Sequence, residues 1–236
     1  MPTAFRYETE LAAPAVRHFR RRGDWDFAHE LDALRAAPDL VAGRRALTFA
    51  VRAAGPPPVT HGLVLRLLEF ATAGVGEAEL RAWAPWGWRD LRRRALEPAL
   101  AAGLIELVDG RWRSPQLQRP YGELVAIELK LRDWRKGIRQ ARANQAFAAE
   151  SWLVMPSLPD EALELASWVG VGLVGVEEGG TTELVAAAVR EPLSPFANRL
   201  FGELVYEQAL EQRLPGAEKL RPLAGSPRRR QLAVSL

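Results

Sequence analysis

The segment from Leu124 to Ala141 constrains the fold most, because a nearly continuous apolar run there ends in charged residues and a basic helix. Residues 123–131 (ELVAIELKL) have the length and composition of a strand, and apolar residues on both faces are typical of a strand inside a sheet. Side chains alternate along a strand, so Glu128 and Lys130 point to the same face near its carboxyl end. Such charges are costly in a sheet unless they pair, bind a metal ion or reach solvent in a cleft.

Helix and strand patterns alternate after this strand. They predict a helix over 132–150, a strand over 151–156, a helix over 160–170, a hairpin over 171–189 turning at Gly179-Gly180, and a last helix over 198–214. This alternation is typical of an α/β sheet with helices packed on it.

The N-terminal part contains fewer regular patterns. Residues 8–23 predict a helix that ends at Gly23. Residues 39–43 and 46–53 predict two short strands, and the Gly-Pro-Pro-Pro at 55–58 ends regular structure.

Residues 59–113 follow a different pattern, with helices expected over 61–73, 76–84 and 87–103 and a hairpin over 104–113 that turns at Asp109-Gly110. Three helices followed by a small hairpin resemble a winged helix-turn-helix domain. In that family the third helix enters the major groove and the hairpin, or wing, touches the DNA backbone.

The resemblance assigns DNA contacts to arginines, whose side chains suit phosphates and guanine edges. The third helix would present Arg89, Arg92, Arg93 and Arg94, and the wing would present Arg111 and Arg113. Alternatively, these arginines form a solvated face, and the small domain packs on a protein or on its own chain. Tryptophans 83, 86 and 88 could support either use.

Composition limits the chemistry of any site. The chain has no cysteine and its three histidines lie far apart, so disulfides are excluded and zinc sites rich in thiolate or histidine are improbable. A catalytic metal would therefore need mainly oxygen ligands. No apolar run reaches the roughly 18–20 residues of a membrane span, so we expect a cytoplasmic protein with no membrane contact.

The strand that carries Glu128 and Lys130 belongs to an ordered set of motifs. Residues 38–41 (PDLV) and 127–130 (IELK) resemble the PD-(D/E)xK nuclease superfamily, in which an aspartate and an E-x-K lie on adjacent strands. Glu10, with Glu8 as a less favoured choice, matches the family's N-terminal glutamate, and Gln140 matches a glutamine after the E-x-K strand. The resemblance implies a restriction-endonuclease-like fold, with a central mixed sheet flanked by helices and interrupted by the small domain.

The resemblance also implies roles for these residues. Asp39 and Glu128 would hold Mg²⁺ or Mn²⁺, helped by the backbone carbonyl of Ile127 and by Glu10, and Lys130 would orient the attacking water or help to deprotonate it. Gln140 lies in a polar row with Lys136 and Asn144 at helical spacing, and this row could position the substrate phosphate or Lys130. Glu30 is a possible substitute for Asp39.

Asp39 and Glu128 are far apart in sequence, and the small domain occupies most of the gap. We therefore divide the chain into residues 1–58 and 114–213 of one nuclease-like domain, an inserted winged helix at 59–113, and a basic tail at 214–236.

The leading hypothesis is a metal-dependent DNA nuclease, such as an endonuclease of repair, recombination or defence. One alternative is a catalytically inactive nuclease-like protein that binds DNA or acts as a regulator. Another is a protein-interaction module. By resemblance, the chain could also form a homodimer.

Overall fold

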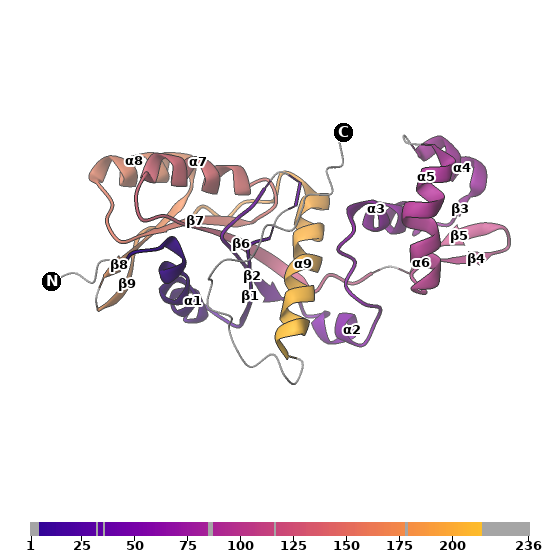
Figure 1. Cartoon of the computed structure of the whole chain (residues 1–236), viewed down its shortest axis with the longest axis horizontal. Helices are drawn as coiled ribbons and strands as arrows, with labels where there is room; N and C mark the ends of the chain where they lie inside the picture. Colours follow the sequence, from indigo (N-terminus) through magenta and orange to yellow (C-terminus); the bar gives the residue numbers. More distant parts are fainter. Residues whose placement is uncertain are drawn as a thin grey trace.

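The protein is described from a computed structural model, which covers residues 5–31, 33–34, 36–84, 87–115, 117–177 and 179–213. The expected basic tail at 214–236 and Trp86 lie outside these residues. Among them, six strands form one sheet in the order β1-β2-β6-β7-β8-β9 (Figure 1). These strands are β1 (Trp25–His29), β2 (Leu40–Arg45), β6 (Tyr121–Leu129), β7 (Glu150–Met155), β8 (Gly172–Glu177) and β9 (Gly180–Val185).

The sheet is mixed, as the sequence predicted. β1, β2 and β6 pair antiparallel, β6, β7 and β8 pair parallel, and β9 returns antiparallel to β8. β6 lies inside the sheet and is buried on both faces from Leu124 to Leu129. Its side chains alternate as expected, because Val125 and Ile127 join one core cluster while Leu124 and Ala126 join another.

Helices cover both faces of this sheet. A 3₁₀ turn (Glu8–Leu11) and α1 (Ala12–Arg20) pack on one face, and α7 (Trp134–Asn144), α8 (Asp160–Val169) and α9 (Pro195–Arg213) pack on the other (Figure 1). Apolar residues at helical spacing make these contacts, such as Leu11 and Ala15 on the first face and Ile138 and Ala141 on the second. No helix among the described residues is long and apolar enough to cross a membrane.

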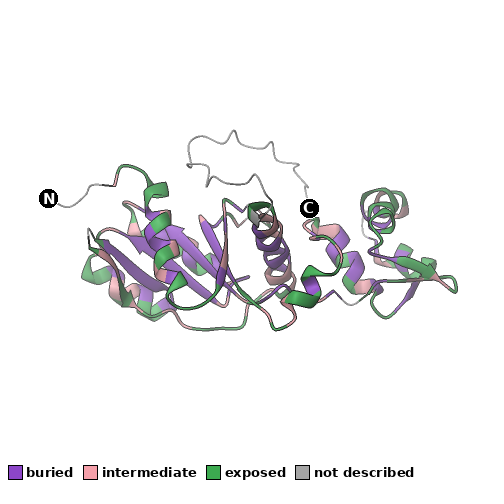
Figure 2. Cartoon of the chain, turned by 90° about the horizontal axis from the view of Figure 1, so that it is seen from below, coloured by how far each residue is buried: buried purple, intermediate pink, exposed green. Residues whose placement is uncertain are grey.

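The middle of the chain forms a smaller unit with its own core (Figure 2). It contains α3 (Gly62–Ala71), α4 (Glu77–Trp83) and α5 (Trp88–Leu91), which continues through a π-helical turn (Arg92–Leu96) into α6 (Glu97–Ala101). Among the described residues, β3 (Val75–Gly76), β5 (Arg111–Arg113) and β4 (Glu106–Val108) form a separate sheet in that order. The hairpin turn is confirmed at Asp109 and Gly110, whose φ angles of 51° and 72° suit a tight turn between twisted strands.

The prediction of a strand over 46–53 is wrong. β2 continues to Arg45, and the next element is a short helix, α2 (Phe49–Ala53). Phe49 packs against Tyr121 and Tyr206, and Arg52, one helical turn later, is buried against α9. These anchors are three residues apart, which suits a helical turn and not the two-residue period of a strand. The strand β1 (Trp25–His29) is likewise not predicted by any sequence pattern noted above.

A buried ion pair joins α2 to α9 and holds the proline-rich connection to the smaller unit. Arg52 and Glu203, whose side chains are 1% and 0% exposed, pair at 2.5 Å. Arg52 also donates hydrogen bonds to the carbonyls of Pro56 and Pro57, and Glu203 accepts one from the backbone N–H of Val59. A buried ion pair is tolerated when hydrogen bonds satisfy its remaining groups, as they do here.

The close packing of β8 on β7 can be tested with Gly172→Ala. A Cβ at Gly172 would overlap the ring of Trp152 in the core, so we expect a loss of about 1–3 kcal/mol in the free energy of unfolding by urea titration. Gly202→Ala in α9 is the matched control, because its Cβ would meet no atom within 4 Å. Equal stability of the two variants would contradict this packing.

Candidate active site

The sheet brings Asp39 next to the end of β6. β2 begins at Leu40, which lies opposite Ile127 in the antiparallel pairing with β6. Asp39 therefore precedes β2 at the point where β6 ends. Its Oδ2 accepts a hydrogen bond of 2.7 Å from the backbone N–H of Leu129, which fixes the carboxylate against β6.

Lys130 lies between two carboxylates. Its Nζ is 3.0 Å from Asp39 Oδ2 and 3.3 Å from Glu128 Oε2, and it donates a hydrogen bond of 2.9 Å to the carbonyl of Leu129. Only 8% of the Lys130 side chain is exposed. Its stem lies against α7 at Gly137, where a Cβ would be 2.6 Å from Leu153 Cδ1 and 3.1 Å from Lys130 Cγ, so the glycine leaves room for both side chains.

Glu128 is the most buried member of this cluster, with 2% of its side chain exposed. Its Oε1 accepts a hydrogen bond of 2.7 Å from Asn144 Nδ2, which reaches it from α7. Asn144 belongs to the polar row of 136, 140 and 144, and no sequence pattern selects it above Gln140. The structure makes Asn144 the member of that row that contacts Glu128.

Burial sets the proton affinity of Glu128. It raises the pKa of this carboxyl from the ordinary 4.5 to about 7, the charge of Asp39 adds to the effect, and Lys130 and Asn144 oppose it. For Lys130, burial alone would lower the pKa, but Asp39 and Glu128 outweigh burial and raise it. The lysine therefore stays protonated near neutral pH, while Glu128 titrates there.

The two N-terminal glutamates have different surroundings. Glu8 Oε2 lies 3.9 Å from Lys130 Nζ, whereas Glu10 Oε2 accepts a hydrogen bond of 2.7 Å from the backbone N–H of Arg6 and caps its own helical turn. The structure thus brings Glu8 to the cluster, although the sequence analysis favoured Glu10. Successive positions on a helical turn face different directions, and only the packing of this turn on β6 selects between them.

Among the described residues, three others that the sequence suggested for the site make no side-chain hydrogen bond or ion pair with Asp39, Glu128 or Lys130. Gln140 Oε1 is buried without a hydrogen-bond partner among the described residues, and Lys136 is exposed one turn earlier on α7. Glu30 has an exposed side chain, and its backbone N–H donates to the carbonyl of Asp39. Glu30 therefore supports the backbone of Asp39 and does not replace its carboxylate.

The cluster fits a hard divalent cation. Among the described residues, no three side chains of His, Cys, Asp or Glu gather as a complete metal cage. Mg²⁺, however, is commonly held by one or two carboxylates together with water and substrate oxygens. Burial is the main cause of the raised pKa of Glu128 and the charge of Asp39 is the second, and a divalent cation beside the two carboxylates would favour the ionised form. Asp39 and Glu128 are suitable ligands, with the backbone of Ile127 beside them.

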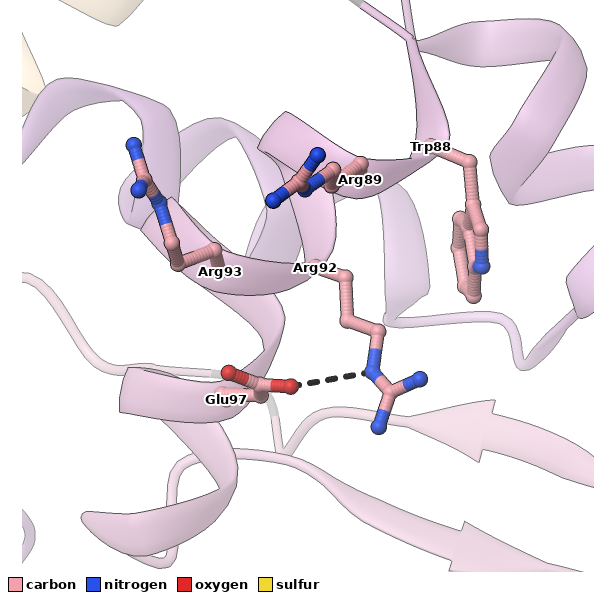
Figure 3. A pocket seen from close by; sticks show the side chains of 5 residues that line it. All are labelled: Trp88, Arg89, Arg92, Arg93 and Glu97. Carbon is pink, nitrogen blue, oxygen red and sulfur yellow. Dashed lines mark ion pairs between the residues drawn. The ribbon is translucent and has the colours of Figure 1, made fainter.

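A second group of charged residues lies on the smaller unit. Trp88, Arg89, Arg92, Arg93 and Glu97 line an open hollow of about 360 Å³ along the helix that runs from α5 to α6 (Figure 3). Arg94 is exposed on the same helix.

The arginines of the wing-like hairpin differ in their contacts. Arg111 donates a hydrogen bond of 2.7 Å to the carbonyl of Gly74 and pairs with Glu79 at 3.1 Å, so part of its charge is neutralised. Arg113 is exposed beside it on β5.

Comparisons with known proteins found no similar protein. A scan against protein-family models found no match, and searches of curated proteins and of solved structures found none either. The functional interpretation therefore rests on the residues and contacts of this chain.

The titration of Glu128 predicts how stability depends on pH. Between about pH 5 and about pH 7 the native carboxyl holds its proton while the unfolded one, with its pKa near 4.5, has lost it. Raising the pH through this window should therefore lower the contribution of Glu128 to the free energy of unfolding.

We expect urea titrations without divalent ions to show this loss as the difference between the parent protein and Glu128→Gln. The comparison cancels His18 and His61, whose lowered pKa values act in the opposite direction in both proteins. Glu177→Gln, at an exposed position, should behave like the parent. The same pH dependence in the parent and in Glu128→Gln would contradict the burial argument.

Proposed function

We propose that the protein is a metal-dependent DNA nuclease that hydrolyses phosphodiester bonds. One observation carries the proposal: the ammonium of Lys130 lies between Asp39 and the buried Glu128 at the meeting point of two adjacent antiparallel strands. This arrangement agrees with the resemblance of PDLV and IELK to the PD-(D/E)xK superfamily. The mixed sheet, with α1 on one face and α7 on the other, supports a restriction-endonuclease-like fold.

Asp39 and Glu128 would hold Mg²⁺ or Mn²⁺, and the carbonyl of Ile127 would add a ligand. When bound, the ion would lower the pKa of a water molecule and offset negative charge at the phosphate. Asn144 would orient the Glu128 carboxylate through its hydrogen bond to Oε1. The Leu129 N–H would hold Asp39 in the same way.

Lys130 would act as a protonated, positively charged hydrogen-bond donor. Hydrolysis forms one bond from the water oxygen to phosphorus and breaks one bond to the leaving oxygen, while negative charge builds up on the phosphate oxygens. The ammonium of Lys130 would stabilise that charge and orient the water, the proton released by the water would pass to solvent, and the leaving oxygen would take a proton from solvent. Glu8, at 3.9 Å from Lys130, would complete the carboxylate shell in place of Glu10.

The smaller unit would dock the DNA. Its helices and hairpin resemble a winged helix, and the helix that would enter the major groove carries Arg89, Arg92, Arg93 and Arg94. Arg113 on the hairpin and Lys136 on α7 are exposed and could contact phosphates, while Arg111 would first have to leave Glu79.

A DNA-binding protein without nuclease activity is the second candidate. One observation favours it: Lys130 already satisfies Asp39 Oδ2 and Glu128 Oε2, so the cluster is stable as a closed ion-pair network. This alternative predicts salt-sensitive DNA binding, because phosphate contacts release counterions, with no cleavage.

The nuclease proposal is tested by incubating purified protein with plasmid, branched and single-stranded DNA in Mg²⁺ or Mn²⁺. We expect cleavage that stops with a chelator and falls at least about 100-fold in Lys130→Met and Glu128→Gln, because each variant removes a charged group from the site. Glu177→Gln, at the exposed end of β8, is the matched control and should cleave normally.

Full cleavage by both site variants would refute the assigned site. Salt-sensitive binding with no cleavage by the parent protein in either metal ion would favour the second candidate.

The choice between the N-terminal glutamates can be tested separately. Glu8→Gln removes a charge beside Lys130, so we expect the cleavage rate to fall about tenfold with little change in stability. Glu10→Gln should leave the rate unchanged and lower the free energy of unfolding by about 0.5–1 kcal/mol, because it weakens a cap. The reverse pattern would restore Glu10 as the functional residue.

A further inference from the structure

The hollow on the smaller unit has an aromatic wall in a fixed position. The guanidinium of Arg81 lies 4.9 Å from the centre of the Trp88 ring, and Arg81 is itself held by Glu77 on α4. Arg81 covers part of the Trp88 ring. The ring is still partly exposed and lines the hollow. A ring fixed in this way loses little entropy when a ligand stacks on it.

Arg92 also lines the hollow. It lies four residues after Trp88 on the same side of the helix, and its Nε pairs with Glu97 Oε1 at 2.9 Å (Figure 3). This ion pair restricts the motion of the Arg92 side chain. A planar group entering the hollow would meet an aromatic ring and a guanidinium, the two partners on which unstacked nucleobases commonly lie.

A second row of the helix carries uncompensated positive charge. Arg89 and Arg93 are also four residues apart and lie next to each other in Figure 3. In the part of the chain that the structure describes, neither makes an ion pair. Like charges at this spacing destabilise a helix, and an anion between them would remove that cost. Phosphates beside a base bound at Trp88 would supply this anion.

The backbone of this helix departs from α-helical geometry at the hollow. Residues Arg92–Leu96 form a π-helical turn, which begins at Arg92 and ends next to Glu97. Isolated π-helical turns inside α-helices are often found at functional sites. Here the wider turn sets the positions of Arg92 and Glu97 relative to each other.

From these contacts we propose that the hollow binds an unpaired nucleotide of DNA, with its base between Trp88 and Arg92 and its neighbouring phosphates at Arg89 and Arg93. The proposal rests on the DNA-docking function assigned above to the smaller unit and specifies its substrate class. Arg89, Arg92 and Arg93 would then contact an unpaired strand in place of the major groove. Away from its ends, a duplex stacks both faces of every base on neighbours, so along the duplex Trp88 can stack only on a base that has left it. The preferred substrate is therefore a duplex that carries a single-stranded tail, gap or branch.

The test measures binding and not cleavage, so that it does not depend on the metal site. Fluorescence anisotropy in a chelating buffer compares a blunt duplex, the same duplex with a single-stranded tail, and the single strand alone. We expect the parent protein to bind the tailed duplex more tightly than the blunt one. Trp88→Ala should weaken binding of the tailed duplex and the single strand about tenfold, and leave the blunt duplex unchanged.

Two further variants control this measurement. Trp168→Ala removes a tryptophan that is 80% exposed on α8, away from the hollow, and should retain the preference for the tail. Trp88 packs against the core of the smaller unit, and Trp88→Phe keeps an aromatic ring there. This variant should retain most of the preference for the tailed duplex, even if the alanine variant folds poorly.

A direct readout is photo-crosslinking of an iodinated base placed in the tail. We expect the crosslink to map to the peptide that contains Trp88. Equal binding of tailed and blunt duplexes by the parent protein, an equal effect of Trp88→Ala on all three DNAs, or crosslinks mapped elsewhere would overturn the proposal.

Failure of this inference and failure of the nuclease proposal give different results. Glu128→Gln should lose cleavage and keep the preference for the tail, because Glu128 lies in the sheet and not on the smaller unit. Cleavage without a tail preference would reject the nucleotide pocket alone. A tail preference without cleavage would reject the nuclease proposal alone.

Discussion

The contact between Lys130 and the carboxylates of Asp39 and Glu128 is the interaction on which the candidate site depends. Glu128 is 2% exposed and Lys130 is 8% exposed, so neither charge can rely on water. Each is stabilised by the other, Asn144 donates to the second oxygen of Glu128, and the backbone N–H of Leu129 donates to the same Asp39 oxygen that Lys130 contacts. This requirement also fixes the position of Asp39, and with it the start of β2 beside the end of β6.

A second buried pair, Arg52 with Glu203, organises the rest of the chain. It fixes the proline-rich segment that leaves the sheet domain, and Arg199 on the same helix binds the returning segment through the carbonyl of Leu117. Leu200 of α9 also joins the core of the smaller unit. The smaller unit is therefore held in place relative to the sheet by α9, and under the proposed function this would let one DNA molecule reach both parts.

Sequence patterns predicted most of the fold, because helices and strands such as β6 and α7 carry clear periodicity and recognisable turn residues. They failed over 46–53, where the burial of Arg52 by Glu203 is a tertiary contact that no local pattern encodes. The same limit applies to the site. The E-x-K spacing identified Glu128 and Lys130, but the packing of the N-terminal turn decided between Glu8 and Glu10, and the path of α7 brought Asn144 and not Gln140 to Glu128.

The proposed function requires Asp39 and Glu128 to hold a divalent cation together beside Lys130. The most direct measurement is anomalous X-ray diffraction from crystals soaked in Mn²⁺ near pH 8, where Glu128 is mainly ionised. We expect one strong anomalous peak at about 2.0–2.3 Å from an oxygen of each carboxylate, lost in crystals of Glu128→Gln. Crystals in which Lys130 still bridges Asp39 and Glu128, with no Mn²⁺ peak at either carboxylate, would contradict it.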